Sequence, residues 1–418
     1  MPSIQFLPRE LVEQISGMLE LQDLAHLGGT CSSLRAFAAP RLFETVVFTD
    51  NARAADSACL AAGRYSAFVR HLKLIVTFQG CTDPECDCLE STSEACFAVA
   101  NPDIGGIPPS AEVLLGGGAL PALKSIIVEF PARYKHAGML FGDWWDEIDP
   151  RLVPMGDNFA IVVRAVTMAL TRNASISSMS LLNYPPISPL DGASPDYNDA
   201  WKELLGRLAD FRLSLFGAFY PLHQPMGYGT EEMLASDDYR ASLQHLESFF
   251  FAHLRSVRRL AICCSKHAPL GGAERGNTNP RTRMSIALAL DPAAMPFLEH
   301  LELNNMFLGP ELGDFLVGLG ADRPLSLCLD NLKPDDHSSL LPGYTWKEFF
   351  DRLVDSRVSI WRFRLAPTEV PVRSSPAHEI MARDPSRRAF PYAWMQLEES
   401  CLQDDMVRNA RSVVEGAD

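Results

Sequence analysis

Four cysteines come nearest to a chemical site by residue type and spacing. They are Cys81, Cys86, Cys88 and Cys96. Four thiolates can bind one zinc ion tetrahedrally, but structural zinc sites usually carry paired Cys-x2-Cys knuckles, which this segment lacks. A cysteine-rich loop is therefore the favoured interpretation and a zinc site the alternative, and we predict neither a metal nor a cofactor.

Other residue types suited to catalysis do not form a recognisable motif. The chain has no Gly-x-Ser-x-Gly sequence, and His378-Glu379 lacks the second histidine of a zinc-protease helix. Cys263 and Cys264 are adjacent on an expected strand, so their side chains should point to opposite faces and not form a redox pair. We expect no catalytic residue; an enzyme with a site in the downstream domain is the least favoured alternative.

The composition is that of a globular protein with a large core. Of 418 residues, 47% are hydrophobic and 21% charged, and the net charge is −15. The negative charge disfavours broad nucleic-acid binding. Arg255, Arg258 and Arg259 are the best candidates for a local basic patch, although solvated surface arginines are favoured. No secretory signal or bilayer-length apolar run is visible, so we expect no membrane partner and a cytoplasmic or nuclear location.

Three short helices are predicted before residue 48. Pro8 suits the first turn of a helix, because its missing N–H would lack a partner there anyway. Apolar residues then recur with helical spacing and share one face of the helix; they are Leu11, Ile15, Met18 and Leu19. We expect Gly28-Gly29 to break the chain before a third helix. This apolar set is too small for a self-sufficient core, so it predicts a surface for a partner; the alternative is a helical subdomain packed on its own downstream domain.

The N-terminal segment resembles the F-box, in the form common among fungal members. The matching pattern reads Leu7-Pro8-x-Glu10-Leu11-x-x-x-Ile15-x-x-x-Leu19, Asp23-Leu24-x-x-Leu27, Cys31-x-x-Leu34-Arg35 and Pro40-x-Leu42-Phe43. The resemblance implies three helices that dock on the adaptor subunit of an SCF-type, cullin-RING ubiquitin ligase. It assigns the adaptor contact to Leu7, Pro8, Leu11, Ile15, Leu19, Leu24, Leu27, Leu34 and Leu42.

Downstream of this segment, short strand-like runs alternate with helical ones. Strands are expected at 68–76, 120–128, 175–182, 254–262, 297–305 and 357–365, and helices at 158–171, 199–208, 242–252, 310–319 and 345–354. Segments rich in Pro, Gly, Ser or Cys at 79–118, 188–199 and 268–280 read as insertions. This alternation favours an α/β fold with parallel strands and helices packed outside.

The strands resemble irregular leucine-rich repeats. The clearest match is Leu298-x-x-Leu301-x-Leu303-x-x-Met306. The predicted organisation is an F-box at 1–48, an irregular leucine-rich-repeat-like solenoid at 60–370, and a polar extension at 371–418 with one helix near 392–413. Trp144 and Trp145 lie in an acidic loop and are expected to fill the core, with an exposed interface as the alternative.

The two resemblances together imply a non-catalytic subunit that recruits substrates for ubiquitination. The F-box would bind the adaptor, and through it a cullin, while the repeat domain would bind a protein substrate that the sequence does not identify. The alternative is an F-box scaffold that works with the adaptor outside the ligase.

Overall fold

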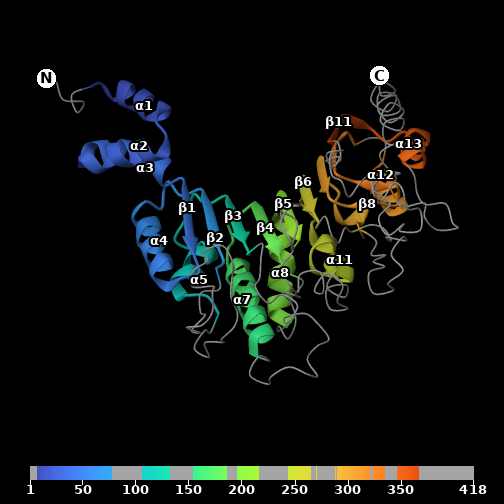
Figure 1. Cartoon of the computed structure of the whole chain (residues 1–418), viewed down its shortest axis with the longest axis horizontal. Helices are drawn as coiled ribbons and strands as arrows, with labels where there is room; N and C mark the ends of the chain where they lie inside the picture. The colour runs from blue at the N-terminus through green and yellow to red at the C-terminus, as the bar shows by residue number, and fades with distance from the viewer. Residues whose placement is uncertain are drawn as a thin grey trace, which may run out of the picture.

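The chain has an α/β fold built on one parallel sheet. The computed structural model describes residues 7–77, 106–131, 154–185, 195–215, 243–264, 270, 288, 290–320, 323–334 and 346–366. Within these ranges three helices come first, and a nine-stranded sheet with helices along one face follows (Figure 1). The predicted α/β class is therefore confirmed.

Strands follow one another across the sheet in chain order. Every strand pairs in parallel with its neighbour, in the order β1-β2-β3-β4-β5-β6-β7-β9-β11. Their bounds are β1 Thr45–Thr49, β2 His71–Ile75, β3 Ser125–Glu129, β4 Ser178–Tyr184, β5 Asp210–Leu215, β6 Arg259–Cys263, β7 His300–Asn304, β9 Leu325–Asp330 and β11 Ile360–Ala366. A second, two-stranded sheet pairs β8 Phe307–Leu308 with β10 Lys333–Pro334.

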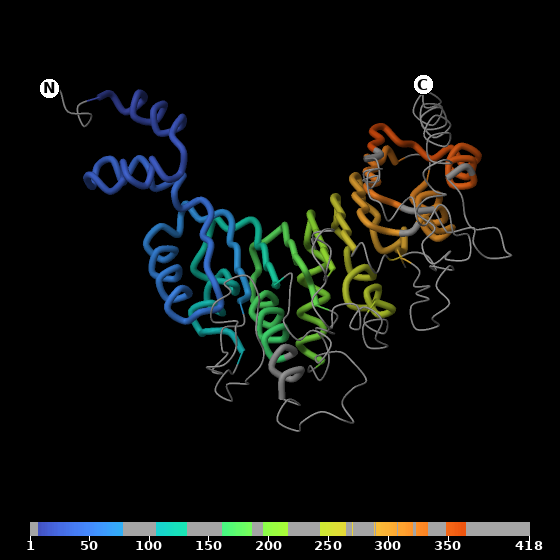
Figure 2. The backbone as a smooth tube through the Cα atoms, in the orientation of Figure 1, coloured from blue at the N-terminus to red at the C-terminus, as the bar shows by residue number. Residues whose placement is uncertain are grey.

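Helices connect successive strands and line the outer side of the arc that the sheet forms (Figure 2). They are α4 Ala52–Arg64, α5 Pro109–Gly116, α7 Pro154–Thr171, α8 Pro195–Arg207, α11 Leu246–Phe249, α12 Pro310–Leu319 and α13 Trp346–Asp355, with short 3-10 helices η4 Phe251–His253 and η6 Pro292–Ala294. Because side chains alternate across a strand, one face of the sheet packs on these helices and the other faces away from them.

Two rows of apolar side chains cross the sheet in register. The first row is Val46, Leu72, Ile126, Met179, Phe211, Leu260, Leu301, Leu327 and Phe363; the second is Phe48, Leu74, Val128, Leu181, Leu213, Ile262, Leu303, Leu329 and Leu365. From β1 to β9 every member of both rows is buried. This ladder is the inner half of the core.

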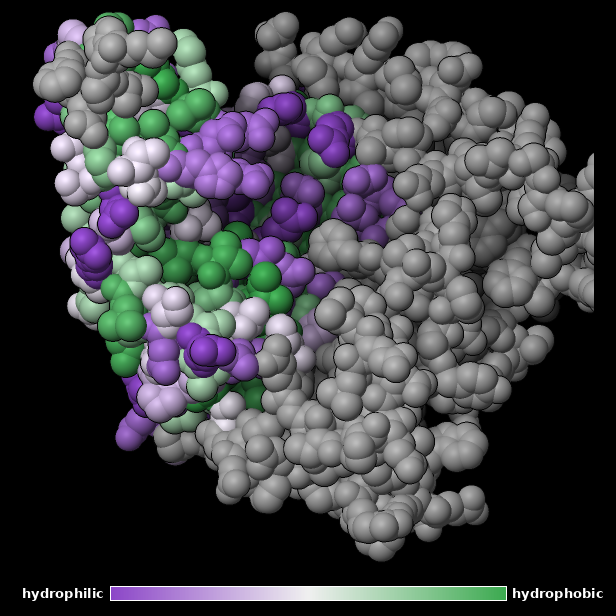
Figure 3. Space-filling view, turned by 60° about the vertical axis from the view of Figure 1, so that its left-hand side comes forward, coloured by the Kyte–Doolittle hydropathy of each residue, from purple (hydrophilic) through white to green (hydrophobic). Residues whose placement is uncertain are grey.

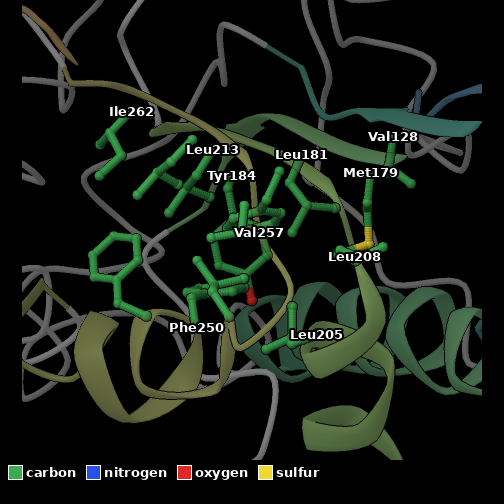
Figure 4. Close-up of a cluster of buried hydrophobic side chains, with 14 of the residues drawn as sticks. Val128, Met179, Leu181, Tyr184, Leu205, Leu208, Leu213, Phe250, Val257 and Ile262 are labelled. Atoms are coloured by element: carbon green, nitrogen blue, oxygen red, sulfur yellow. The ribbon is translucent and has the colours of Figure 1, made fainter. Parts of the chain in front are cut away.

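The helices supply the other half of the core. In Figure 4, Leu205 and Leu208 at the end of α8 lie below the strand side chains Met179 and Leu181. Phe250, which is fully buried, stacks on Phe211 at 5.8 Å between ring centroids and meets Tyr184 edge-on at 5.4 Å.

Asparagines with left-handed backbone lie within one residue of the ends of three strands. Asn183, Asn305 and Asn331 have φ of 52°, 56° and 53°, a region that Asn tolerates better than most residues. Asn183 Nδ2 donates to the carbonyl of Phe130 at 3.1 Å, and Asn305 Nδ2 donates to that of Cys264 at 3.1 Å. Asn331 donates to the amide oxygen of Asn305. Each side chain therefore ties the end of its strand to a neighbour.

Several predicted elements agree with the structure, and others were missed. The six expected strands overlap β2, β3, β4, β6, β7 and β11, and the expected helices overlap α7, α8, α11 with η4, α12 and α13. The sequence reading did not find β1, β5, β9, α4 or α5. Helix α5 lies inside the insertion expected at 79–118, and the sheet begins at Thr45 instead of after residue 60. The C-terminal helix expected near 392–413 lies outside the described residues.

Asn305 offers a test of the strand-end hydrogen bonds. We expect Asn305→Ala to lower the free energy of unfolding by about 2 kcal/mol, because it removes a buried hydrogen bond and leaves alanine in the left-handed region. Asn305→Gly removes the same hydrogen bond without the backbone penalty, so it should cost less. Urea unfolding would measure both; equal stability of Asn305→Ala and the wild type would contradict this role.

Candidate functional site

The N-terminal helices form a separate unit beyond the β1 edge of the sheet (Figures 1 and 2). They are α1 Arg9–Met18, α2 Leu21–Thr30 and α3 Ser32–Leu42. α3 runs into β1 after only two residues. At this junction Phe43 stacks on Tyr65 at 3.8 Å between ring centroids, and the Glu44 carbonyl accepts hydrogen bonds from Arg70 N and His71 N at 2.9 and 3.0 Å. The helical unit is therefore joined to the sheet without a linker.

A few small or apolar residues are buried inside the helical unit. Val12 of α1, Leu24 of α2 and Leu34 of α3 are buried. Gly28 is buried too, and a Cβ there would lie 3.4 Å from Ala38 Cβ, so this glycine sits where α2 and α3 come close together. The expected break at Gly28-Gly29 does not occur: α2 continues through both glycines to Thr30.

Arg41 of α3 forms hydrogen bonds to the C-terminal end of α1. Its guanidinium donates to the carbonyl oxygens of Ser16 and of Leu19, the latter at 2.8 Å. These carbonyls lie at the C-terminal end of α1, where the last helical C=O groups lack partners within the helix and the dipole favours a cation. α1 has no basic residue in its own last turn, so α3 provides the positive charge.

Arg9 links the other end of α1 to α3. Its Nε donates to Glu13 Oε1 at 2.7 Å, and its guanidinium carbon lies 6.0 Å from the ring centroid of Phe37. The hydrogen bond to Glu13 and the charge of that carboxylate raise the pKa of Arg9, which therefore stays charged. α1 is thus held to α3 near both of its ends.

A group of apolar side chains stays exposed on this unit. The exposed fractions are 38% for Leu7, 45% for Leu11, 75% for Met18 and 59% for Leu21. Pro8 beside them is also exposed, and its carbonyl accepts from Leu11 N and Val12 N at the start of α1. We call Leu7, Pro8, Leu11, Met18 and Leu21 the apolar stripe. In Figure 3 hydrophobic side chains show on this unit, at the upper left.

The structure divides the nine residues predicted to contact a partner into three groups. Leu7, Pro8 and Leu11 are exposed; Ile15, Leu19, Leu27 and Leu42 are half-buried. Leu24 and Leu34 have 0% and 3% exposure, so they pack inside the unit and are replaced in the candidate contact set. Two exposed residues join the candidate contact set instead. Met18 belongs to the helical face predicted from the sequence, whereas Leu21 was not part of that prediction.

The other residues with possible chemistry are buried or paired. Burial raises the pKa of Cys263 to about 11, and it raises that of Cys264 as well. Both thiols are buried. Cys264 lies just past the end of β6, so the alternation of side chains along the strand, which would place the two thiols on opposite faces, does not extend to it. Arg258 pairs with Glu299 at 2.5 Å and Arg259 with Asp210 at 3.5 Å, so two of the three candidates for a basic patch are paired with carboxylates on the surface.

Two other predicted features fall outside the described residues. These are the cysteine cluster from Cys81 to Cys96 and the pair Trp144 and Trp145. In the described ranges, no three His, Cys, Asp or Glu side chains come together as a metal site would require. Nor does any helix there have the length and apolarity needed to cross a membrane.

No family model matches this chain, and no curated protein matches its sequence. The candidate site is therefore defined by its own geometry: an exposed apolar stripe on a small helical unit, two residues before the first strand of a large sheet.

The two glycines of α2 should respond differently to substitution. Gly29 has open space around its Cβ direction, so Gly29→Ala should raise the free energy of unfolding of the helical unit by about 1 kcal/mol through its higher helix propensity. Gly28→Leu should destabilise the unit, because α3 occupies the space. Thermal unfolding would measure the stability of both variants. A Gly29→Ala variant less stable than the wild type would contradict the assignment of a continuous helix.

Removing the Arg41 side chain should loosen α1 selectively. We expect Arg41→Ala to speed amide hydrogen exchange in residues 9–18, because the C-terminal carbonyls lose their cationic donor. Exchange in β2 to β9 should not change. Arg53→Ala, an exposed arginine of α4, serves as a control. Unchanged exchange across α1 would show that Arg41 does not hold this helix.

Proposed function

We propose that this chain is an F-box protein that serves as the substrate-recognition subunit of an SCF-type ubiquitin ligase. In this proposal the helical unit docks on the adaptor subunit, and through it on a cullin. The sheet domain, an irregular leucine-rich-repeat-like solenoid, binds a protein substrate. The chain itself contributes no catalytic residue.

The observation that carries the proposal is the apolar stripe. Leu7, Pro8 and Leu11 are three of the residues that the F-box resemblance assigns to the adaptor, and all three are exposed. Met18 and Leu21 extend the same exposed group. Burying apolar side chains in a groove of another protein is favourable by about 25 cal/mol per Å² before the costs of association.

The sheet supports the second half of the proposal. The strands follow one another in chain order, and each turns two alternate apolar side chains toward the core. This is the arrangement of a repeat protein, in which each repeat adds one strand and one connection next to the previous one. Such a domain offers a long exposed face for a partner. The short junction at Phe43 and Glu44 would hold that face at a set position relative to the adaptor, which keeps a bound substrate close to the transfer machinery.

Loss of the apolar stripe should abolish adaptor binding without unfolding the chain. We expect Leu7→Ala, Pro8→Ala to reduce co-purification with the adaptor by about tenfold or more, because the exposed side chains would form the centre of the contact. Leu60→Ala is the matched control: this leucine of α4 is 78% exposed but lies outside the helical unit.

The outcome also separates the alternatives. Undiminished co-purification of the double variant would contradict the docking assignment. Adaptor binding by the wild type without any cullin in the complex would favour the scaffold that works outside the ligase.

A further inference from the structure

The last described strand carries an irregularity that brings an aromatic residue to the open face of the sheet. In the pairing of β11 with β9, Ile360 lies opposite Leu325 and Arg362 opposite Ser326, so Trp361 has no partner of its own. Such a bulge redirects side chains and is common beside functional sites. Here Ile360 is buried, whereas Trp361 and Arg362 are both exposed.

Trp361 is held in place although it is 54% exposed. Its ring meets the ring of His300 edge-on, with centroids 5.9 Å apart. His300 lies on β7 opposite Ser326 of β9, and Ser326 in turn lies opposite Arg362, the residue that follows Trp361. A large aromatic ring that is exposed and ordered by a neighbour is the type of residue that dominates binding at protein interfaces.

Three arginines are exposed on strands of the same sheet. Arg362 and Arg364 are exposed on β11, and Arg212 is exposed on β5. None of the three forms an ion pair with a described residue, in contrast to Lys73, which pairs with Glu129 at 2.6 Å on β2 and β3. Two carboxylates share the face: Glu302 is exposed, and Asp330 accepts a hydrogen bond from Asn304 at 3.3 Å. On β11 itself, the charged residues that follow Trp361 are Arg362 and Arg364.

We propose that Trp361, His300, Arg362 and Arg364 form a docking surface for an acidic segment of a protein partner. Charge complementarity identifies the partner's chemistry. Guanidinium groups that form no ion pair with a described residue can donate bidentate hydrogen bonds to Asp or Glu side chains, and the indole can pack against an apolar residue between them. A chain with a net charge of −15 repels acidic proteins at long range, so a local exception of this kind would give selectivity. This inference rests on the proposed substrate-binding role and names the class of substrate.

A displayed library of random peptides, selected against the immobilised full-length chain, tests the surface directly. We expect the enriched peptides to combine Asp or Glu with at least one large apolar residue. Their affinity, measured by fluorescence anisotropy, should fall by about tenfold or more with Trp361→Ala and with Arg362→Ala, Arg364→Ala. It should also fall as salt is raised, because exposed charge pairs are screened.

Arg53→Ala, on α4 at the opposite end of the sheet, should leave peptide binding unchanged. Enriched peptides without an acidic bias, no enrichment at all, or affinities that the β11 variants do not alter would each overturn the inference. Adaptor co-purification is measured on the same preparations. If the wild-type chain does not bind the adaptor, the proposed ligase role is refuted. If it binds the adaptor but no acidic peptide, only this docking surface is refuted.

Discussion

The alternation of buried and more exposed side chains along parallel strands is the constraint on which the rest of the structure depends. Because each strand pairs with its neighbour in register, Leu72, Ile126, Met179 and their equivalents form one continuous buried row. A shift by one residue would turn each such row toward solvent. The same alternation leaves the intervening residues, such as Lys73 and Glu302, on the open face, where they are free to vary without disturbing the core.

Sequence reasoning found the elements whose pattern was long and regular. The strand around Leu301 and Leu303 and the helix from Pro310 to Leu319 were both predicted, since several apolar residues repeat there at the right spacing. β1 and β9 were missed, although each is at least as long as the five-residue strands β2 and β3 that were found. One usable signal was overlooked: an asparagine stands two residues after Leu181, Leu303 and Leu329, where the strand turns away.

The candidate site was predictable in outline but not in detail. Helical periodicity identifies which residues share a face, yet it does not say whether that face turns toward the next helix or toward solvent. Leu24 and Leu34 therefore looked like contact residues, although α2 and α3 bury them against each other. Gly28 looked like a helix break for a similar reason, because only the packing of α3 explains why a small residue stands there. The bulge at Trp361 depends on the register with β9, which a single strand does not encode.

The two proposed surfaces, the apolar stripe and the surface around Trp361, lie toward opposite ends of one sheet. The proposed role of the Trp361 surface rests on adaptor binding by the apolar stripe. The most direct test of that binding is amide hydrogen exchange on the full-length chain, with and without a saturating amount of purified adaptor. We expect slower exchange in residues 9–30 when the adaptor is bound, and unchanged exchange in β7, β9 and β11. Identical exchange of the helical unit in both samples would contradict the claim that its exposed leucines and Met18 are a binding surface.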